Sequence, residues 1–128
     1  MKGRNYTLDP GIYIYVGKAG GRGGVRARVA RHIRKEKAKR WHIDQLTTAK
    51  GARILGIVSC ESEDPVEAES CLAWCLILQG HPYVPGFGST DTRDPSHLIG
   101  PLSPEEAAFS AASCAERCCE EASLAAPT

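Results

Sequence analysis

A short segment with strictly alternating side chains does most to limit the folds open to this chain. Residues 12–16 read Ile-Tyr-Ile-Tyr-Val and lie between a Pro-Gly turn and a glycine. β-Branched and aromatic residues at a period of two predict a β-strand. Its isoleucines and valine then share one face, and Tyr13 and Tyr15 share the other. We therefore expect a strand with an apolar face toward the core and two phenols on its opposite face.

The most clearly marked helix starts at Asp64. This residue suits the N-cap position, Pro65 fits the first helical position, and Glu67 completes a capping-box pattern. Gly80 is a typical stop after the last helical turn. The pattern predicts a helix over residues 65–79.

Three further segments complete the expected organisation. Residues 25–39 have the periodicity of an amphipathic helix, residues 53–60 resemble a buried strand, and Ser-Pro-Glu-Glu at 103–106 indicates another helix start. A chain of 128 residues suffices for one domain. We expect an α/β (α+β) fold with a small antiparallel sheet flanked by helices. This domain would span residues 1–101, and residues 102–128 would form an appended helix or a disordered tail.

Opposite charges divide the chain into two halves. Residues 1–60 carry 14 Lys/Arg and 3 Asp/Glu, whereas residues 61–128 carry 2 and 12. Within residues 18–40, ten Lys/Arg face a single acidic residue, Glu36. Such an asymmetry indicates that the first half binds a polyanion such as a nucleic acid. A solvated helix face that pairs with the acidic half of the same chain is the alternative.

The sequence gives no sign of a membrane or an export signal. No apolar run approaches the roughly 18 to 20 residues that a membrane span needs, and no apolar stretch follows Met1. We therefore expect a cytoplasmic protein whose six cysteines are reduced thiols rather than a disulfide framework. A small metal or redox site at Cys114, Cys118 and Cys119 is the alternative.

One carboxylate interrupts the apolar side of the helix expected at 65–79. Glu69 shares a helical stripe with Leu72, Ala73 and Leu76. Carboxylates are rarely buried unless they are paired or bound to a metal. Glu69 is thus a candidate metal ligand, unless the helix N-terminus stabilises it or it reaches solvent.

Arg28 and His32 lie one turn apart beside the apolar stripe of the basic helix. A guanidinium can hold two phosphate oxygens, and an imidazole can orient a phosphate or a leaving group. The phenols of Tyr13 and Tyr15 can activate water or orient a phosphate. Alternatively, the first pair belongs to an ordinary basic face and the tyrosines pack beneath a helix.

Taken in chain order, these residues resemble the GIY-YIG nuclease superfamily, and within it the small stand-alone Uri-type branch. Six blocks within residues 3–99 carry the resemblance. They read PGIYIYVGKA at 10–19, GVRARVARH at 24–32, WHID at 41–44, ESCLA at 69–73, GFGS at 86–89 and SHL at 96–98.

The resemblance implies a three-stranded antiparallel sheet and an endonuclease that cleaves DNA phosphodiester bonds with Mg²⁺ or another divalent cation, without a small-molecule cofactor. It implies catalytic roles for Tyr15, Arg28 and His32, with Tyr13 beside them, and a metal-binding role for Glu69. The candidate nucleic-acid contacts are Lys18, Arg22, Arg26, Arg31, Lys35 and His42.

The chain departs from the family pattern at the first signature strand. In the family this strand lies well before the second motif, whereas here Gly-Ile-Tyr at 11–13 almost touches Tyr-Val-Gly at 15–17. The downstream spacing fits Tyr15 as the second-motif tyrosine, so we expect the first strand to be missing or partly replaced by residues 2–8. Residues 12–16 would then pair with residues 53–60. A catalytically impaired nucleic-acid-binding module on the same fold, or a protein-interaction domain, is the alternative function.

Overall fold

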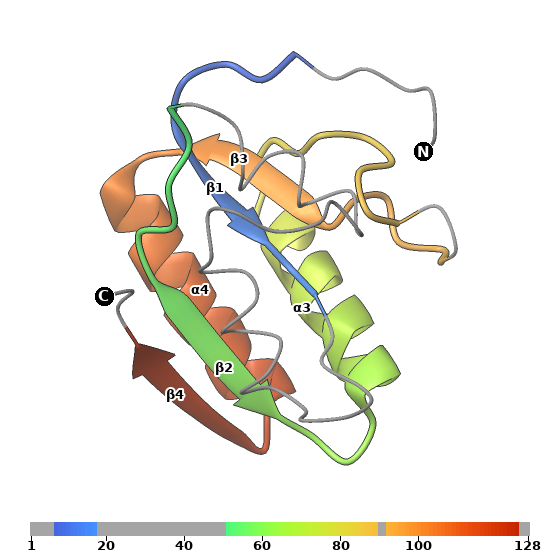
Figure 1. Ribbon diagram of the computed structural model, residues 1–128. Helices are drawn as coiled ribbons and strands as arrows, with labels where there is room; N and C mark the ends of the chain where they lie inside the picture. Colours follow the sequence, from blue (N-terminus) through green and yellow to red (C-terminus); the bar gives the residue numbers. More distant parts are fainter. Residues whose placement is uncertain (1–6, 18–50, 90–91, 126–128) are drawn as a thin grey trace.

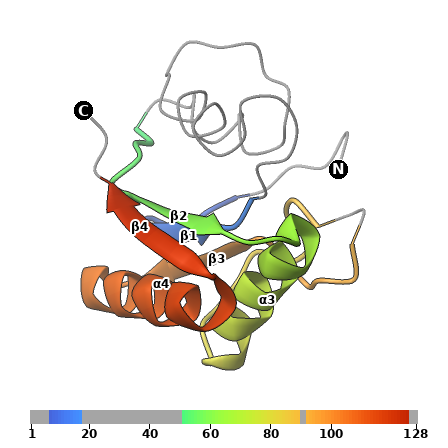
Figure 2. The ribbon, with the colours of Figure 1, turned by 90° about the horizontal axis from the view of Figure 1, so that it is seen from below.

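The computed structural model describes residues 7–17, 51–89 and 92–125 of the chain. Within these ranges, four short strands and two helices follow one another in the order β1, β2, α3, β3, α4 and β4 (Figure 1). Both helices lie on the same side of the strands (Figure 2). The fold is α/β with antiparallel pairing throughout the described strands, which confirms the expected class.

The first strand, β1 (Ile12–Tyr15), pairs with β3 (Leu98–Leu102) in an antiparallel ladder. Ile14 lies opposite Ile99 and Tyr15 lies opposite Leu98. Because side chains directly opposite each other share a face, the isoleucines and the tyrosine occupy different faces. The alternation expected for this segment is therefore confirmed.

The expected pairing of residues 12–16 with residues 53–60 is wrong. The strand in that region, β2 (Ile57–Glu61), starts later and pairs with β4 (Glu121–Ala125) in a separate two-stranded sheet. It is also not a buried strand, since Val58 is 36% exposed and Leu55, before the strand, is 55% exposed. An apolar run cannot by itself distinguish an edge strand from a buried one.

The helix α3 (Pro65–Leu78) begins and ends as its sequence predicts. The Asp64 side chain accepts a hydrogen bond from the backbone N–H of Glu67 (3.1 Å), and Pro65 occupies the first turn. Gly80 has a φ of +91° and its N–H donates to the carbonyl of Ile77. The buried residues of the helix are Ala68, Glu69, Ala73 and Leu76, so the inward stripe with its single carboxylate is confirmed.

The helix start expected at Ser103 is also confirmed. In α4 (Pro104–Cys118), the Ser103 side chain accepts from the Glu106 N–H, and the Glu106 side chain accepts from the Ser103 N–H. This helix packs against α3 and β1 and continues into β4. Helix α4 thus packs against the rest of the described structure, and β4 pairs with β2.

The cysteines are paired, which corrects the expectation of six reduced thiols. The disulfides are Cys60–Cys119, Cys71–Cys118 and Cys75–Cys114, and no described cysteine is free. Two of them link α3 to α4, because cysteines four residues apart on one helix face cysteines four residues apart on the other. Sequence spacing alone could not reveal this, since it depends on how the two helices pack.

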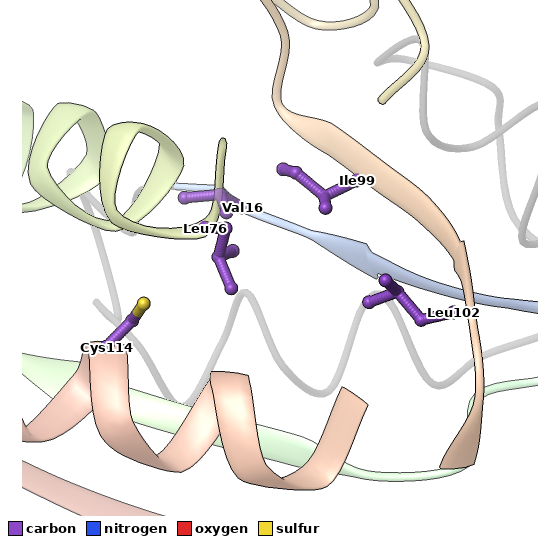
Figure 3. Packing of buried hydrophobic residues seen from close by; sticks show 5 residues of the cluster. All are labelled: Val16, Leu76, Ile99, Leu102 and Cys114. Atoms are coloured by element: carbon purple, nitrogen blue, oxygen red, sulfur yellow. The ribbon is translucent and has the colours of Figure 1, made fainter. Parts of the chain in front are cut away.

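The core lies between the helices and one face of the β1/β3 sheet. Its buried members are Val16, Leu76, Ile99, Leu102 and Cys114 (Figure 3). Ile14 and Leu72 pack against them. No helix within the described ranges combines the length and the apolar character needed to cross a membrane.

Candidate functional site

The two tyrosines of β1 lie on the sheet face opposite the helices. Tyr13 and Tyr15 pack with Val84, Phe87 and Leu98 in a second apolar cluster. The residues after α3 form this cluster by folding back onto the sheet, where the N–H of Val84 bonds to the carbonyl of Leu98 (2.9 Å). The phenols are thus held in place on the outer face, as the alternating pattern predicts.

Tyr13 is engaged in local hydrogen bonding. Its hydroxyl donates to the backbone carbonyl of Asp9 (2.7 Å). Burial, together with the nearby Asp9 carboxylate, raises the pKa of Tyr13, and the hydrogen bond only partly opposes this. A phenol with a raised pKa is a poor base at neutral pH.

The Tyr15 ring and the Cβ atom of His97 both approach Gly88. A Cβ atom added at Gly88 would meet the Tyr15 ring at 3.4 Å and the His97 Cβ at 3.4 Å, and Gly88 has a φ of +70°. The N–H of Val16, the residue after Tyr15, also bonds to the carbonyl of His97 (2.8 Å). Both the conformation and the space at position 88 therefore favour glycine.

His97 connects this corner to the buried carboxylate of α3. Its Nδ1 lies 3.9 Å from Glu69 Oε2, and its Nε2 lies 2.7 Å from Asp94 Oδ2. Ser70 Oγ donates to the same Asp94 oxygen (2.9 Å). Glu69 is 7% exposed, Asp94 7% and His97 1%. The result is a buried polar cluster of Glu69, Ser70, Asp94 and His97, which we call the His97 cluster.

Backbone hydrogen bonds fix the loop that carries Asp94 and His97. The N–H of Gly86 bonds to the carbonyl of Pro95, and the N–H of His97 bonds to the carbonyl of Phe87 (both 2.9 Å). Ser96, which is fully buried, donates its hydroxyl proton to the carbonyl of Val84 and accepts a hydrogen bond from the N–H of Leu98 (3.0 Å). The loop is therefore a firm support for the imidazole despite its lack of regular secondary structure.

The predicted site residues divide into two groups. Three of them are described: Glu69 lies near His97 on the Ile14 face of the sheet, whereas Tyr13 and Tyr15 lie on the other face, where Gly88 separates the Tyr15 ring from the His97 Cβ. The remaining predictions lie outside the described residues: Lys18, Arg22, Arg26, Arg28, Arg31, His32, Lys35 and His42.

Sequence reasoning did not identify His97 and Asp94 as site residues. His97 belongs to one of the blocks that carry the family resemblance. Asp94, three residues before it, was the sequence signal that could have indicated a His–Asp pair. Neither residue stands on a periodic element whose face could be predicted. Their convergence depends on the loop folding back over the end of the sheet.

The donor set of the His97 cluster fits a hard or borderline divalent cation. Glu69 supplies carboxylate oxygens, which Mg²⁺ prefers, and water and phosphate can complete such a shell. Among the residues that the structure describes, no group of three or more His, Cys, Asp or Glu side chains is arranged to hold a metal. A cation here would thus rely on few protein ligands, as is usual for Mg²⁺ bound together with phosphate.

Comparison with known proteins gives one match. A family model described as "Domain of unknown function DUF123" matches residues 1–120. Neither a curated protein nor a solved structure matches the chain.

Proposed function

This chain belongs to the DUF123 family, and we propose that it is a metal-dependent endonuclease of the GIY-YIG type that cleaves DNA phosphodiester bonds. The description of the family names no activity, so the proposal rests on the site residues and on the charge of the chain. It also rests on the resemblance, because the six motif blocks occur in the same order as in those nucleases.

The observation that carries the proposal is the environment of Glu69. This carboxylate is 7% exposed on the inward stripe of α3, 3.9 Å from the buried imidazole of His97. Burying a carboxylate is costly unless it has a charged or hydrogen-bonding partner. Buried ionisable groups of this kind gather at functional sites, which makes Glu69 a candidate functional residue.

Each residue would have a distinct task. A divalent cation held by Glu69 would supply neutralisation of charge on the scissile phosphate. Arg28 would hold phosphate oxygens in a fork, and His32 would orient the phosphate or the leaving group. Tyr15 would orient the attacking water and, in its deprotonated phenolate form, would accept the proton of that water. Lys18, Arg22, Arg26, Arg31, Lys35 and His42 would bind the DNA backbone.

A plasmid-nicking assay tests the proposal. Supercoiled DNA should be nicked in Mg²⁺ and left intact in EDTA, and Glu69→Gln should lower the rate by roughly 100-fold or more, because the neutral amide holds a cation poorly. Glu67→Gln is the matched control, since it removes an exposed carboxylate from the same helix. Nicking that resists EDTA, or that survives Glu69→Gln unchanged, would refute the proposal.

A binding module without cleavage is the second candidate, and the state of Tyr13 favours it. The Tyr13 phenol is committed to the Asp9 carbonyl and its pKa is raised. Such a module would still bind DNA through phosphates. For four to six neutralised phosphates, log K should fall with log[salt] at a slope of roughly −4 to −5. This slope combined with no nicking would select the second candidate.

We propose a cytoplasmic location on the grounds that the expected substrate is DNA. Three disulfides are unusual in the cytosol of mesophiles, but they are common in intracellular proteins of hyperthermophiles. Trapping thiols with an alkylating agent during cell lysis tests the proposal. Unreacted, disulfide-bonded protein in the cytoplasmic fraction is the expected result, and its confinement to an exported fraction would refute the location.

A further inference from the structure

We propose that the chain, when its disulfides are reduced, binds one Zn²⁺ ion between α3 and α4 through four cysteine thiolates. The ligands are Cys71, Cys75, Cys114 and Cys118. The inference goes beyond the nuclease proposal and does not depend on it, because these cysteines belong neither to the His97 cluster nor to the predicted DNA contacts.

The first step is the arrangement of the cysteines on the two helices. Two of them lie one turn apart on α3 and two lie one turn apart on α4, so each pair shares one helix face. The two faces meet, because Cys71 lies across from Cys118 and Cys75 lies across from Cys114, each with a Cα–Cα distance of 5.8 Å. The four side chains therefore point into one space between the helices.

The second step is the fit in distance. Residues four apart on a helix are separated by about 6 Å along its axis, so the four Cα atoms mark the corners of a rough square. Its centre is about 4 Å from each corner, a distance that a cysteine side chain and a Zn–S bond of about 2.3 Å together span. One ion therefore fits at the centre. An iron–sulfur cluster needs more room, because its cysteines surround several iron and sulfur atoms.

The third step is the reduction that frees the ligands. In the structure these sulfurs are bonded in pairs and are not thiolates. Two molecules of a dithiol reductant break the two S–S bonds, each supplying two electrons and two protons. The products are four protein thiols and two reductant molecules in their disulfide form. Zn²⁺ then binds four thiolates, and the four thiol protons are released to solvent.

The side chains around the sulfurs suit thiolate ligands. The Gln79 Nε2 amide is directed at Cys114 Sγ (3.4 Å) and at Cys75 Sγ (3.9 Å). Arg117 and Cys75 line the same surface groove, and the arginine offsets part of the charge of −2 on a Zn²⁺ with four thiolates. Hydrogen-bond donors and a nearby cation favour a thiolate over a thiol. The groove also leaves Cys75 partly exposed, which gives reductant and ion a route from solvent.

The ligand chemistry then selects the cation. Four thiolates in a tetrahedral arrangement are typical of structural Zn²⁺ sites. Mg²⁺, the cation of the proposed nuclease, prefers oxygen ligands. The same four cysteines would thus join α3 to α4 by disulfides under oxidising conditions and by Zn²⁺ under reducing conditions.

The test uses Zn²⁺ alone as the probe and the whole chain. The protein is reduced with a phosphine, freed of it without oxygen, and titrated with Zn²⁺ against a chromophoric chelator. The reduced chain should bind one Zn²⁺ ion more than the oxidised chain, with a Kd below roughly 100 nM. A reduced chain that binds no more Zn²⁺ than the oxidised chain would overturn the inference.

A double variant assigns the ligands without changing them. The chain has six cysteines, so Cys60→Ser/Cys119→Ser removes the third bridge and leaves only the four proposed ligands. It should bind Zn²⁺ as tightly as the wild type. X-ray absorption of this variant with one equivalent of Zn²⁺ should show four sulfur atoms at about 2.3 Å. Loss of binding, or a shell with three or fewer sulfur atoms, would overturn the assignment to the two helices.

A single substitution completes the test. Cys75→Ser, made in the double variant, leaves three thiolates and should weaken Zn²⁺ binding roughly tenfold or more. Ser113→Ala is the matched control, because Ser113 lines the same groove but supplies no sulfur. Circular dichroism of the Zn²⁺-free reduced proteins shows whether they remain helical. Zn²⁺ affinity that Cys75→Ser leaves unchanged would overturn the inference.

Discussion

The two regions that meet at the core are held together by different kinds of interaction. The disulfide region, made of α3, α4, β2 and β4, contains all three cross-links. The polar region, made of β1, β3 and residues 81–97, has none; there, buried Ser, Asp and His side chains and loop hydrogen bonds fix the structure.

This difference indicates which part of the fold needs disulfide bonds for its stability. Helix α4 has only three buried residues, Ser110, Cys114 and Ala115, and Phe109 on it is 73% exposed. Because such a helix buries little apolar surface, the disulfides supply the stabilisation of the folded state that apolar packing does not supply. In the polar region, by contrast, side chains that could act on a ligand also maintain the fold.

We expect reduction of the disulfides to lower the free energy of unfolding more than any other change. If reduction left it unchanged, the contrast between the two regions would be wrong. In the chain-entropy model, a disulfide that closes a loop of about 40 residues lowers the entropy of the unfolded chain. This stabilises the folded state by roughly 4 kcal/mol. The three bridges span 39, 47 and 59 residues. Because they are nested, each of the two outer bridges adds less stabilisation than the innermost one, Cys75–Cys114. Urea unfolding with and without a phosphine reductant measures this loss. An unchanged midpoint would show that packing alone holds the disulfide region.

Asp94→Ala should be the most damaging single change in the polar region. It leaves His97 Nε2 and Ser70 Oγ without their shared acceptor in a buried site. Unsatisfied buried groups cost about 1–3 kcal/mol each, so we expect a loss of about 2–3 kcal/mol in the free energy of unfolding. Glu116→Ala, an exposed change on α4, should stay within about 0.5 kcal/mol. Equal effects for the two variants would contradict a structural role for the His97 cluster.

Ser103→Ala should have a smaller effect, at the start of α4. It removes the acceptor for the Glu106 N–H, and loss of an N-cap typically costs about 1 kcal/mol. Thermal unfolding under oxidising conditions measures it. Ser113→Ala, inside the same helix, is the control and should be nearly neutral because alanine favours helix. A destabilisation at Ser113 as large as at Ser103 would argue against the cap.

The smallest expected effect is a pH dependence from Glu106. Hydrogen bonds from Ser103, the backbone one first, lower the pKa of Glu106 below its usual 4.5. The stabilisation is therefore present above pH 4.5 and is lost as the pH falls through the lowered pKa of the folded state. Glu106→Gln should remove this part of the acid sensitivity in melting curves recorded between pH 6 and pH 3. Identical acid profiles for both proteins would contradict it.

Features set by neighbouring residues could be predicted from the sequence. The Asp64 and Ser103 caps, the Gly80 stop and the two faces of residues 12–16 all depend on local geometry. The inward position of Glu69 follows from helical periodicity in the same way. These predictions needed no knowledge of which elements pack together.

Features that depend on distant partners could not be predicted. The strand β3 contains Gly100 and Pro101, which are unfavourable in strands, yet it pairs with β1 across more than 80 residues. The cysteine pairs depend on the packing of α3 against α4. The His97 cluster combines one helix with one irregular loop, so Glu69 and Ser70 had predictable positions in the sequence, whereas Asp94 and His97 did not.

The nesting of the disulfides has a consequence for limited proteolysis. Every bridge encloses residues 76–113, because the innermost joins Cys75 to Cys114. A protease that cuts once in the loop of residues 81–97 therefore yields two fragments that remain one molecule on a non-reducing gel. A cut before Cys60 instead releases an N-terminal fragment that no cross-link retains, and with it β1, which carries Tyr15.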